Sequence, residues 1–336
     1  MVMRRPRRRL HAALGGMLIL FAGLVITSCG SGVTAEQAAT GTAAPTAAPS
    51  IDYQCPPIKS QLYPPDNPWN TDISNYPVHP NSDNFIANIG ADKGLHEDFG
   101  IMWEGRPSGI PYCIVSGDAP KVPVTFEYAD ESDPGPYPIP ENPPIEGGPD
   151  SDGDRHILML DEDNGMLYEL WHAYLREDGW HAGSGAIFDL NSNDLRPLGW
   201  TSSDAAGLPV LPGLVRYDEV VEKGEINHAL RFTVTETQRG YILPATHFAS
   251  RSSKAILMPM GLRLRLRADY DISNFPPDAQ VILRAFKRYG MILADNGGDW
   301  FISGAPDPRW NQDNLSTIRR VTGGDFEVIA TGEILH

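Results

Sequence analysis

The chain has 336 residues, 41% hydrophobic and 21% charged, which suits one large domain or two and excludes wholesale disorder. Its 33 glycines and 30 prolines predict many turns and argue against a helical bundle. The formal net charge is −16. The leader described below carries five arginines and no acidic residue, so the rest of the chain has 22 basic and 43 acidic residues and a net charge of about −21. So acidic a surface repels phosphate backbones and argues against a nucleic-acid partner.

Residues 1–28 have the pattern of a bacterial lipoprotein signal peptide. A basic stretch, Arg4–Arg9, precedes an apolar segment, Ala12–Ile26, that has the length of a signal core and is short for a spanning helix. The sequence Ile-Thr-Ser-Cys follows, in which a peptidase would cut before Cys29 and the thiol would carry lipid. An ordinary secretory leader or an uncleaved anchor is the alternative. We expect an exported protein, lipid-anchored to the bacterial membrane and facing the periplasm or the exterior.

The segment after the signal peptide predicts a tether and then a folded body. Residues 29–50 are nearly all Ala, Thr, Gly, Ser and Pro, which cannot form a core. Residues 51–336 are predicted to form a single β-rich globular domain. Its two cysteines, Cys55 and Cys113, are predicted to form a disulfide because an exported protein with an even cysteine count favours pairing. Two free thiols are the alternative.

The first part of the body carries weak strand signals and a long loop. Two short apolar runs, Gly109–Ser116 and Val122–Tyr128, precede an acidic, Pro-rich segment over residues 130–154. We predict a long surface loop there rather than a domain linker, because the strands before it have too few partners for a core of their own.

Strand signals are dense in the rest of the chain. A hairpin is predicted around the turn Asp161–Gly165, and a second around Asp295–Gly298, between Met291–Ala294 and Trp300–Ser303. The first hairpin joins residues 156–160 to 167–174, and further strands are predicted at residues 185–190, 229–235, 261–269 and 325–330.

Helices are few. Pro277–Tyr289 has apolar residues at helical spacing, proline at its start and Gly290 after its end, and residues 311–320 predict a shorter helix. Many short strands with long irregular connections predict an all-β fold, a sandwich of jelly-roll type with one or two peripheral helices and long Pro/Gly-rich loops.

Six segments between residues 67 and 327 resemble a family of uncharacterised exported bacterial (lipo)proteins. They are NPWN from Asn67, AGSGAIFDL from Ala182, GWTSSDAAGLPVLPGLVRYDEV from Gly199, HALRFTV from His228, ILADNG from Ile292 and WFISGAPDPRW from Trp300. The resemblance covers nearly the whole body after the tether. It implies no activity, so no functional residue is carried over from it.

The supply of acidic, amide and aromatic residues is typical of a carbohydrate-binding surface. In residues 168–174, strand alternation places Glu169 and Trp171 on one face, a carboxylate beside an aromatic platform as a sugar subsite needs. The alternative is that this face belongs to the core. Glycosidic hydrolysis needs two carboxyl groups, and Glu169 is the first candidate, with Asp189 or Asp295 as the second. The predicted substrate-binding residues are Trp171, His172, His247 and Trp300.

A polysaccharide lyase would need a cation beside a uronate carboxylate and a base. His228, Arg231 and Tyr241 are the candidates. Arg263, Arg265 and Arg267 alternate along a predicted strand and would form an anion-binding stripe, or else a solvated face with acidic partners across the sheet.

No cofactor or metal is expected. The histidines show no ligand spacing, and the calcium-like stretch Asp150–Asp154 is followed by Arg155 where such a loop has glycine, so calcium is the weaker reading of these residues. The sequence predicts a tethered lipoprotein that binds and cleaves a polysaccharide or cell-envelope glycan, with hydrolysis ahead of β-elimination. It would contact the membrane through its lipid alone. The alternative is a non-catalytic carbohydrate-binding or structural envelope lipoprotein.

Overall fold

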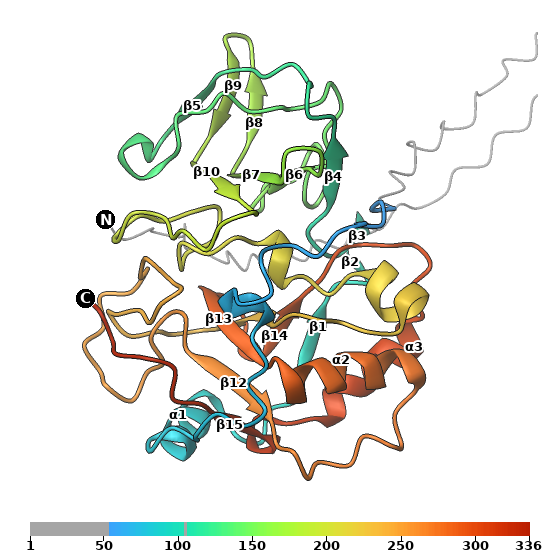
Figure 1. Ribbon diagram of the computed structural model, residues 1–336, viewed down its shortest axis with the longest axis vertical. Coiled ribbons are helices and arrows are strands. Elements are labelled where there is room, and N and C mark those ends of the chain that lie inside the picture. The colour runs from blue at the N-terminus through green and yellow to red at the C-terminus, as the bar shows by residue number, and fades with distance from the viewer. Residues whose placement is uncertain (1–53, 104–105) are drawn as a thin grey trace, which may run out of the picture. The chain divides into compact units, whose positions relative to one another are not determined.

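A six-stranded mixed sheet forms one part of the fold (Figure 1). Its order is β1-β14-β11-β13-β12-β15. The computed structural model describes residues 54–103 and 106–336, so the predicted signal peptide, the tether and Cys29 lie outside the described residues. The strands are β1 (His96–Asp98), β11 (Leu230–Val234), β12 (Arg263–Leu266), β13 (Met291–Asn296), β14 (Phe301–Ser303) and β15 (Phe326–Val328).

A four-stranded sheet, β10-β7-β6-β4, lies between two hydrophobic clusters. Leu158 and Leu160 of β6 belong to one cluster, and Ile157 and Met159 belong to the other, because alternate residues of a strand point to opposite faces. The first cluster also contains Phe232 and much of the six-stranded sheet, so the two sheets share a core. The strands are β4 (Tyr112–Val115), β6 (Ile157–Asp161), β7 (Met166–Trp171) and β10 (Ser184–Asp189).

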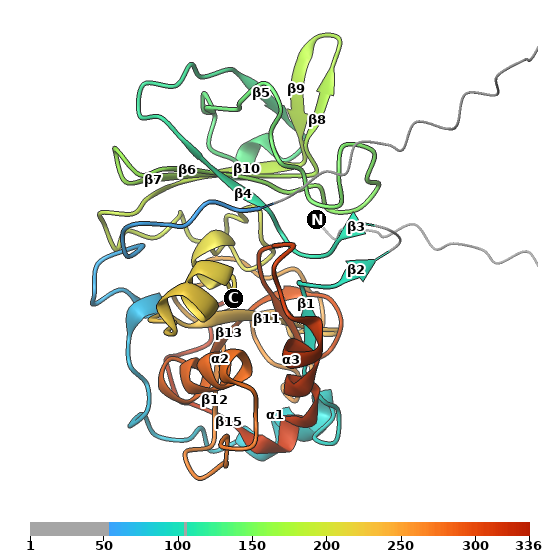
Figure 2. The ribbon, with the colours of Figure 1, turned by 90° about the vertical axis from the view of Figure 1, so that its right-hand side faces the viewer.

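The second cluster is completed by a small sheet and by the acidic segment. The small sheet pairs β9 with β5 and β8 (Figure 2). Tyr137 of the segment 130–154 is fully buried, and Ile139 and Ile145 are nearly so. Beyond η2 this segment contains no helix or strand, and its apolar residues are part of the core rather than of the surface. The remaining strands are β2 (Met102–Trp103), β3 (Arg106–Pro107), β5 (Val124–Phe126), β8 (Tyr174–Arg176) and β9 (Gly179–Ala182).

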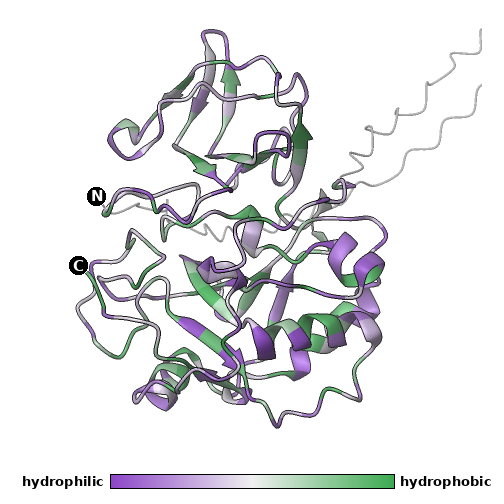
Figure 3. Ribbon diagram, in the orientation of Figure 1, coloured by the Kyte–Doolittle hydropathy of each residue, from purple (hydrophilic) through white to green (hydrophobic). Residues whose placement is uncertain are grey.

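Helix α2 (Pro277–Arg288) confirms the strongest helix prediction. It begins at a proline and ends just before Gly290, which has a φ of 70°. Its apolar stripe, green in Figure 3, includes the buried Ile282 and Phe286. The other helical segments are α1 (Ser82–Ile89), α3 (Gln312–Ser316), the π-helix η4 (Asp218–Lys223) and the 3₁₀ turns η1 (Pro68–Asn70), η2 (Ala129–Glu131), η3 (Leu211–Gly213), η5 (Thr317–Arg320) and η6 (Gly323–Asp325).

The β-rich class is confirmed, and the jelly-roll arrangement is not. Jelly rolls are antiparallel, whereas β1–β14, β11–β13, β4–β6 and β5–β9 are parallel pairs. The first predicted hairpin is present, since β6 pairs with β7. The second is wrong, because β11 lies between β13 and β14 and pairs with both.

The predicted disulfide is also absent, since Cys55 and Cys113 are free thiols. Burial raises the pKa of each thiol to about 12 and so disfavours the reactive thiolate.

Candidate functional site

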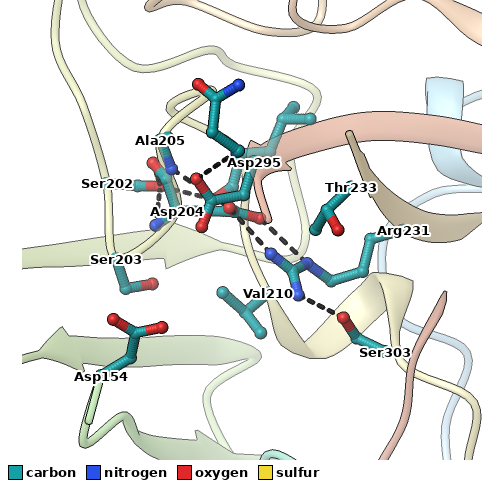
Figure 4. Close-up of polar contacts among 12 residues, drawn as sticks. Asp154, Ser202, Ser203, Asp204, Ala205, Val210, Arg231, Thr233, Asp295 and Ser303 are labelled. Atoms are coloured by element: carbon teal, nitrogen blue, oxygen red, sulfur yellow. Dashed lines mark hydrogen bonds and ion pairs between the residues drawn. The ribbon is translucent and has the colours of Figure 1, made fainter. Parts of the chain in front are cut away.

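A buried ion pair joins the six-stranded sheet to the loop that precedes η3. Arg231 on β11 donates to Asp204 through Nε at 3.1 Å and Nη2 at 2.9 Å, and its Nη1 donates to Ser303 on β14 (Figure 4). Arg231 is 4% exposed and Asp204 is 2% exposed. The guanidinium and the carboxylate therefore satisfy each other out of reach of solvent.

Asp295 lies next to this pair at an irregularity of β13. Leu293 pairs with Phe232 and Asp295 pairs with Thr233, so Ala294 is an extra residue and forms a β-bulge. Bulges often redirect a side chain beside an active site. The Asp295 side chain is only partly exposed. Burial, followed by the charge of Asp204, raises the pKa of Asp295 to about 7, so this carboxyl group holds its proton much longer than an ordinary aspartate.

The four-stranded sheet fixes the backbone that presents Asp204. Glu169 on β7 is fully buried and accepts hydrogen bonds from Ser203 Oγ at 2.6 Å, Val210 N at 2.9 Å and Leu211 N at 2.9 Å. Burial raises the pKa of Glu169, against the effect of these bonds, which favour its charged form. Glu169 therefore contacts protein donors on every side and does not face solvent.

His156 supports the same loop. Its Nε2 lies 3.0 Å from the carbonyl oxygen of Ser203, and its Nδ1 lies 2.6 Å from Glu146 Oε2. Both neighbours are acceptors, so both ring nitrogens must donate. Burial alone would lower the pKa of His156, but the Glu146 carboxylate outweighs it and raises the pKa to about 9. The ring is a cation at neutral pH.

A second carboxylate, Asp154, lies near Asp295 and beside an aromatic ring. Its Oδ1 accepts from Trp171 Nε1 at 3.3 Å, and its charge contributes to the raised pKa of Asp295. Asp154 is exposed, and Trp171 is partly exposed. Figure 4 draws Asp154 with Asp204 and Asp295.

The backbone beside Asp154 and Trp171 is strained. Arg155 has a φ of 53° and His172 a φ of 56°, backbone angles that residues other than glycine rarely adopt. Arg155 is locked there by hydrogen bonds to four carbonyl oxygens and lies 4.1 Å from the ring centroid of Tyr174. Strain of this kind concentrates at functional sites.

Asp98, on β1, is a further acidic residue at the site. It is in register with Ser303, the partner of Arg231. Burial and then the charge of Glu146 raise the pKa of Asp98. No sequence pattern singled out Asp98 or Asp204. The only signal for Asp204 was its place in the long segment from Gly199 that carries the family resemblance.

The structure brings two predicted residues together, Arg231 and Asp295, places Trp171 beside Asp154, and separates other predicted residues from them. Ala186 of β10 pairs with Glu169 of β7, so these two side chains point to the same face of the sheet. Asp189 follows Ala186 at an odd spacing along β10, so its side chain points to the opposite face. Asp189 is exposed and accepts from the Asn191 backbone in a local turn. These two carboxylates cannot flank one bond.

Two predicted aromatic residues are core residues. Trp300 is fully buried, and its Nε1 donates to the Gly90 carbonyl, so its ring cannot stack on a sugar. Tyr241 is 4% exposed and its backbone bridges Met260 and Leu335, which places it away from any solvent-facing base position.

The predicted histidines lie in different places. His228 contacts the Ala229 carbonyl through Nδ1 and Glu219 through Nε2, so both nitrogens are engaged with acceptors and neither can act as a base. His247 contacts the Ala205 carbonyl through Nδ1 at 2.7 Å, close to the Asp204 loop. His172 lines a pocket of about 280 Å³ with Tyr174, and the two side chains are hydrogen-bonded.

Two residues of the predicted arginine stripe, Arg263 and Arg265, are buried, whereas the Arg267 side chain is 42% exposed. Arg263 donates to the carbonyl oxygens of Pro68, Thr71 and Tyr289, and Arg265 pairs with Glu327 across the sheet. Cross-strand acid pairing, the alternative considered from the sequence, accounts for Arg265.

Within residues 54–103 and 106–336, no group of three or more His, Cys, Asp or Glu side chains is arranged to hold a metal ion. None of the helices in that part of the chain is long and apolar enough to span a membrane. Comparisons with protein-family models, with curated proteins and with solved structures find no match to the chain.

Proposed function

We propose that this protein is an exported, membrane-tethered lipoprotein that binds a polysaccharide and hydrolyses its glycosidic bonds, with Asp295 as the proton donor. The observation that carries the proposal is the position of Asp295 at the bulge of β13, beside the buried Asp204–Arg231 pair. Burial and the charge of Asp204 raise its pKa to about 7 there, so the carboxyl group keeps its proton in mildly acidic solution, as a general acid requires.

The remaining residues of the site fit this role. In the proposed reaction Asp295 gives its proton to the glycosidic oxygen as the bond from the anomeric carbon to that oxygen breaks. A water molecule adds to the anomeric carbon, and its proton passes to Asp154. Trp171, hydrogen-bonded to Asp154, supplies an aromatic face for a sugar ring. Asp204 and Arg231 are buried, so they act as positioning residues and maintain the charge beside Asp295.

Elimination is less well supported than hydrolysis. A lyase needs a cation free to neutralise a uronate and a base free to remove a proton. Arg231 is neutralised by Asp204, and both nitrogens of His228 are engaged with acceptors.

The test is an assay of the purified full-length protein, in detergent, on a panel of neutral and uronate polysaccharides. New reducing ends without the ultraviolet absorbance of unsaturated uronate would support hydrolysis. Both signals together would favour elimination. If neither appeared on substrates that bind, the enzyme proposal would fail.

A non-catalytic carbohydrate-binding protein is the second candidate. It is favoured by the pocket of about 280 Å³ lined by His172, Tyr174, Arg176 and His181, which adjoins Trp171. Binding without cleavage that is lost in Trp171→Ala and unchanged in Asp295→Asn would support this candidate over the first.

A further inference from the structure

A second polar pocket lies away from Asp295. It has a volume of about 300 Å³ and is formed by the segment Lys59–Leu62, by the π-helix η4 and by residues that follow it. π-Helical turns are rare and often occur at functional sites. The lining side chains used below are Lys59, Arg216, Glu219, Lys223, Glu225 and His228.

Arg216 is the unusual member of this lining. Its side chain is 4% exposed, and its Nη2 pairs with Glu219 Oε1 at 2.5 Å. Nε and Nη1 are buried and have no hydrogen-bond partner, although Nε lies 3.6 Å from Asp218 Oδ1. A buried guanidinium with unused donors is costly, and such a group calls for a partner. The natural partner of a guanidinium is an oxyanion, because its fork of donors matches carboxylate and phosphate oxygens.

The two carboxylates that line the pocket, Glu219 and Glu225, each contact a cation. Glu219 is shared between Arg216 and His228, whose Nε2 lies 3.0 Å from Glu219 Oε2. Burial would raise the pKa of Glu219, but the charges of Arg216 and His228 prevail and lower it, so this carboxylate is ionised. Glu225 lies 3.7 Å from Arg288. Both lining carboxylates therefore have cationic partners of their own.

Two lysines complete the pocket. Lys223 is about half exposed and contacts Asp218 and the carbonyl oxygen of Ile58. Lys59 is exposed on the facing segment. Three cations thus line the pocket together with two carboxylates, and the unused donors of Arg216 distinguish it from an ordinary cluster of ion pairs.

We propose that this pocket binds a small oxyanion, a phosphate or carboxylate group, through Arg216, Lys59 and Lys223. The site is separate from the proposed hydrolytic site, and its occupant is a ligand rather than the group that reacts. The same chemistry would accept an inorganic phosphate, a phosphorylated glycan or the carboxylate of a uronic sugar.

The experiment is isothermal titration of the full-length protein with sodium phosphate and, separately, with sodium glucuronate, against sodium chloride at matched ionic strength. Saturable binding of phosphate alone would assign a phosphate ligand, and binding of glucuronate alone would assign a carboxylate ligand. Arg216→Lys should weaken the binding about tenfold, because it keeps the charge and loses the fork. Lys59→Gln should weaken it about fivefold.

Controls separate this site from general charge effects and from the proposed hydrolase. Lys254→Gln removes the same charge from an exposed loop and should leave binding unchanged. Asp295→Asn should bind the anion like the parent protein, whatever happens to hydrolysis. The proposal is overturned if neither anion binds beyond the chloride background, or if Lys59→Gln and Lys254→Gln behave alike. Because Lys59 is exposed, its variant tests the site even if Arg216→Lys does not fold.

Discussion

Asp204 and Asp295 are neighbouring carboxylates with different environments. Asp204 is held in a two-pronged ion pair with Arg231, whereas Asp295 has no cationic hydrogen-bond partner among the contacts described and is in part exposed. Burial raises the pKa of Asp204 as well, but the ion pair with Arg231 works against that rise, so this ion pair favours the negative charge on Asp204 and leaves the proton to Asp295. This division of roles gives the site one acid that can meet a substrate.

Asp295→Asn is expected to reduce polysaccharide hydrolysis by about 10³-fold, the scale on which general acid catalysis acts, with little loss of substrate affinity. The measurement is release of reducing ends beside a binding titration with the same substrate. Asp189→Asn is the matched control, because Asp189 is exposed in a turn on the opposite face from Glu169. Full activity in Asp295→Asn, or its loss in Asp189→Asn, would contradict the assignment.

The pH dependence of hydrolysis follows from the same proton. The acid form of Asp295 is present below its pKa and is lost as the pH rises through about 7, so kcat/KM should decline above that pH. A pH–rate profile measures this directly. A rate that rises through pH 7 to 9 would be incompatible with Asp295 as the acid.

The raised pKa of Asp295 should also make the stability of the folded protein depend on pH. The folded-state pKa of Asp295 is raised above its ordinary value of 3.8, so the stability associated with the neutral form is present below that value and is lost as the pH rises through about 7. Asp295→Asn should therefore gain in melting temperature over the parent protein at pH 8 and gain much less at pH 4. Calorimetry at the two pH values tests this, and equal shifts at both would argue that Asp295 ionises normally.

Glu169→Gln is expected to destabilise the fold by about 3 kcal/mol rather than to remove a catalytic group. The Val210 N–H lies within hydrogen-bond distance of both carboxylate oxygens, so either orientation of the amide places an N–H donor against this buried donor. Denaturant unfolding measures the loss. Glu177→Gln, on an exposed residue, should be neutral. A Glu169→Gln protein that is as stable as the parent but inactive would instead restore Glu169 as a catalytic candidate.

Cys29→Ala is expected to abolish lipid attachment. In cells fed radiolabelled palmitate, the parent protein should carry label and sediment with membranes, while the variant carries none. Cys55→Ala should remain labelled, since its thiol is internal to the fold. Equal labelling of the Cys29→Ala variant would refute the lipoprotein prediction.

Local signals in the sequence were reliable where the structure they predict is local. The Asp161–Gly165 turn and the proline and glycine that bound α2 depend on neighbouring residues, and both elements are present. The hairpin at Asp295–Gly298 failed because β11, about sixty residues earlier in the chain, occupies the position between its two strands. Strand order of this kind is set by packing of the whole domain and leaves no mark in a short window.

The same reason explains the partial success at the site. Arg231 and Asp295 were chosen for their chemistry, and they meet because β11 and β13 run parallel with a bulge at Ala294. Glu169 was chosen because strand alternation places it on the same face as Trp171, but hydrophobic clusters cover both faces of this sheet. Asp204 lies in an irregular loop without periodicity, so apart from its place in the segment from Gly199 nothing in the sequence distinguished it from other acidic residues.

The anchoring of the Asp204 loop has a consequence for how the site is assembled. Glu169 and His156 contact Ser203 of this loop from the side of the four-stranded sheet. Arg231, on the six-stranded sheet, binds the carboxylate of Asp204. Neither sheet holds the Asp204 loop by itself, so a chain in which only one of the two sheets has formed would lack the arrangement of Asp204, Arg231 and Asp295. A local disturbance of either sheet should therefore displace the Asp204 carboxylate from Asp295.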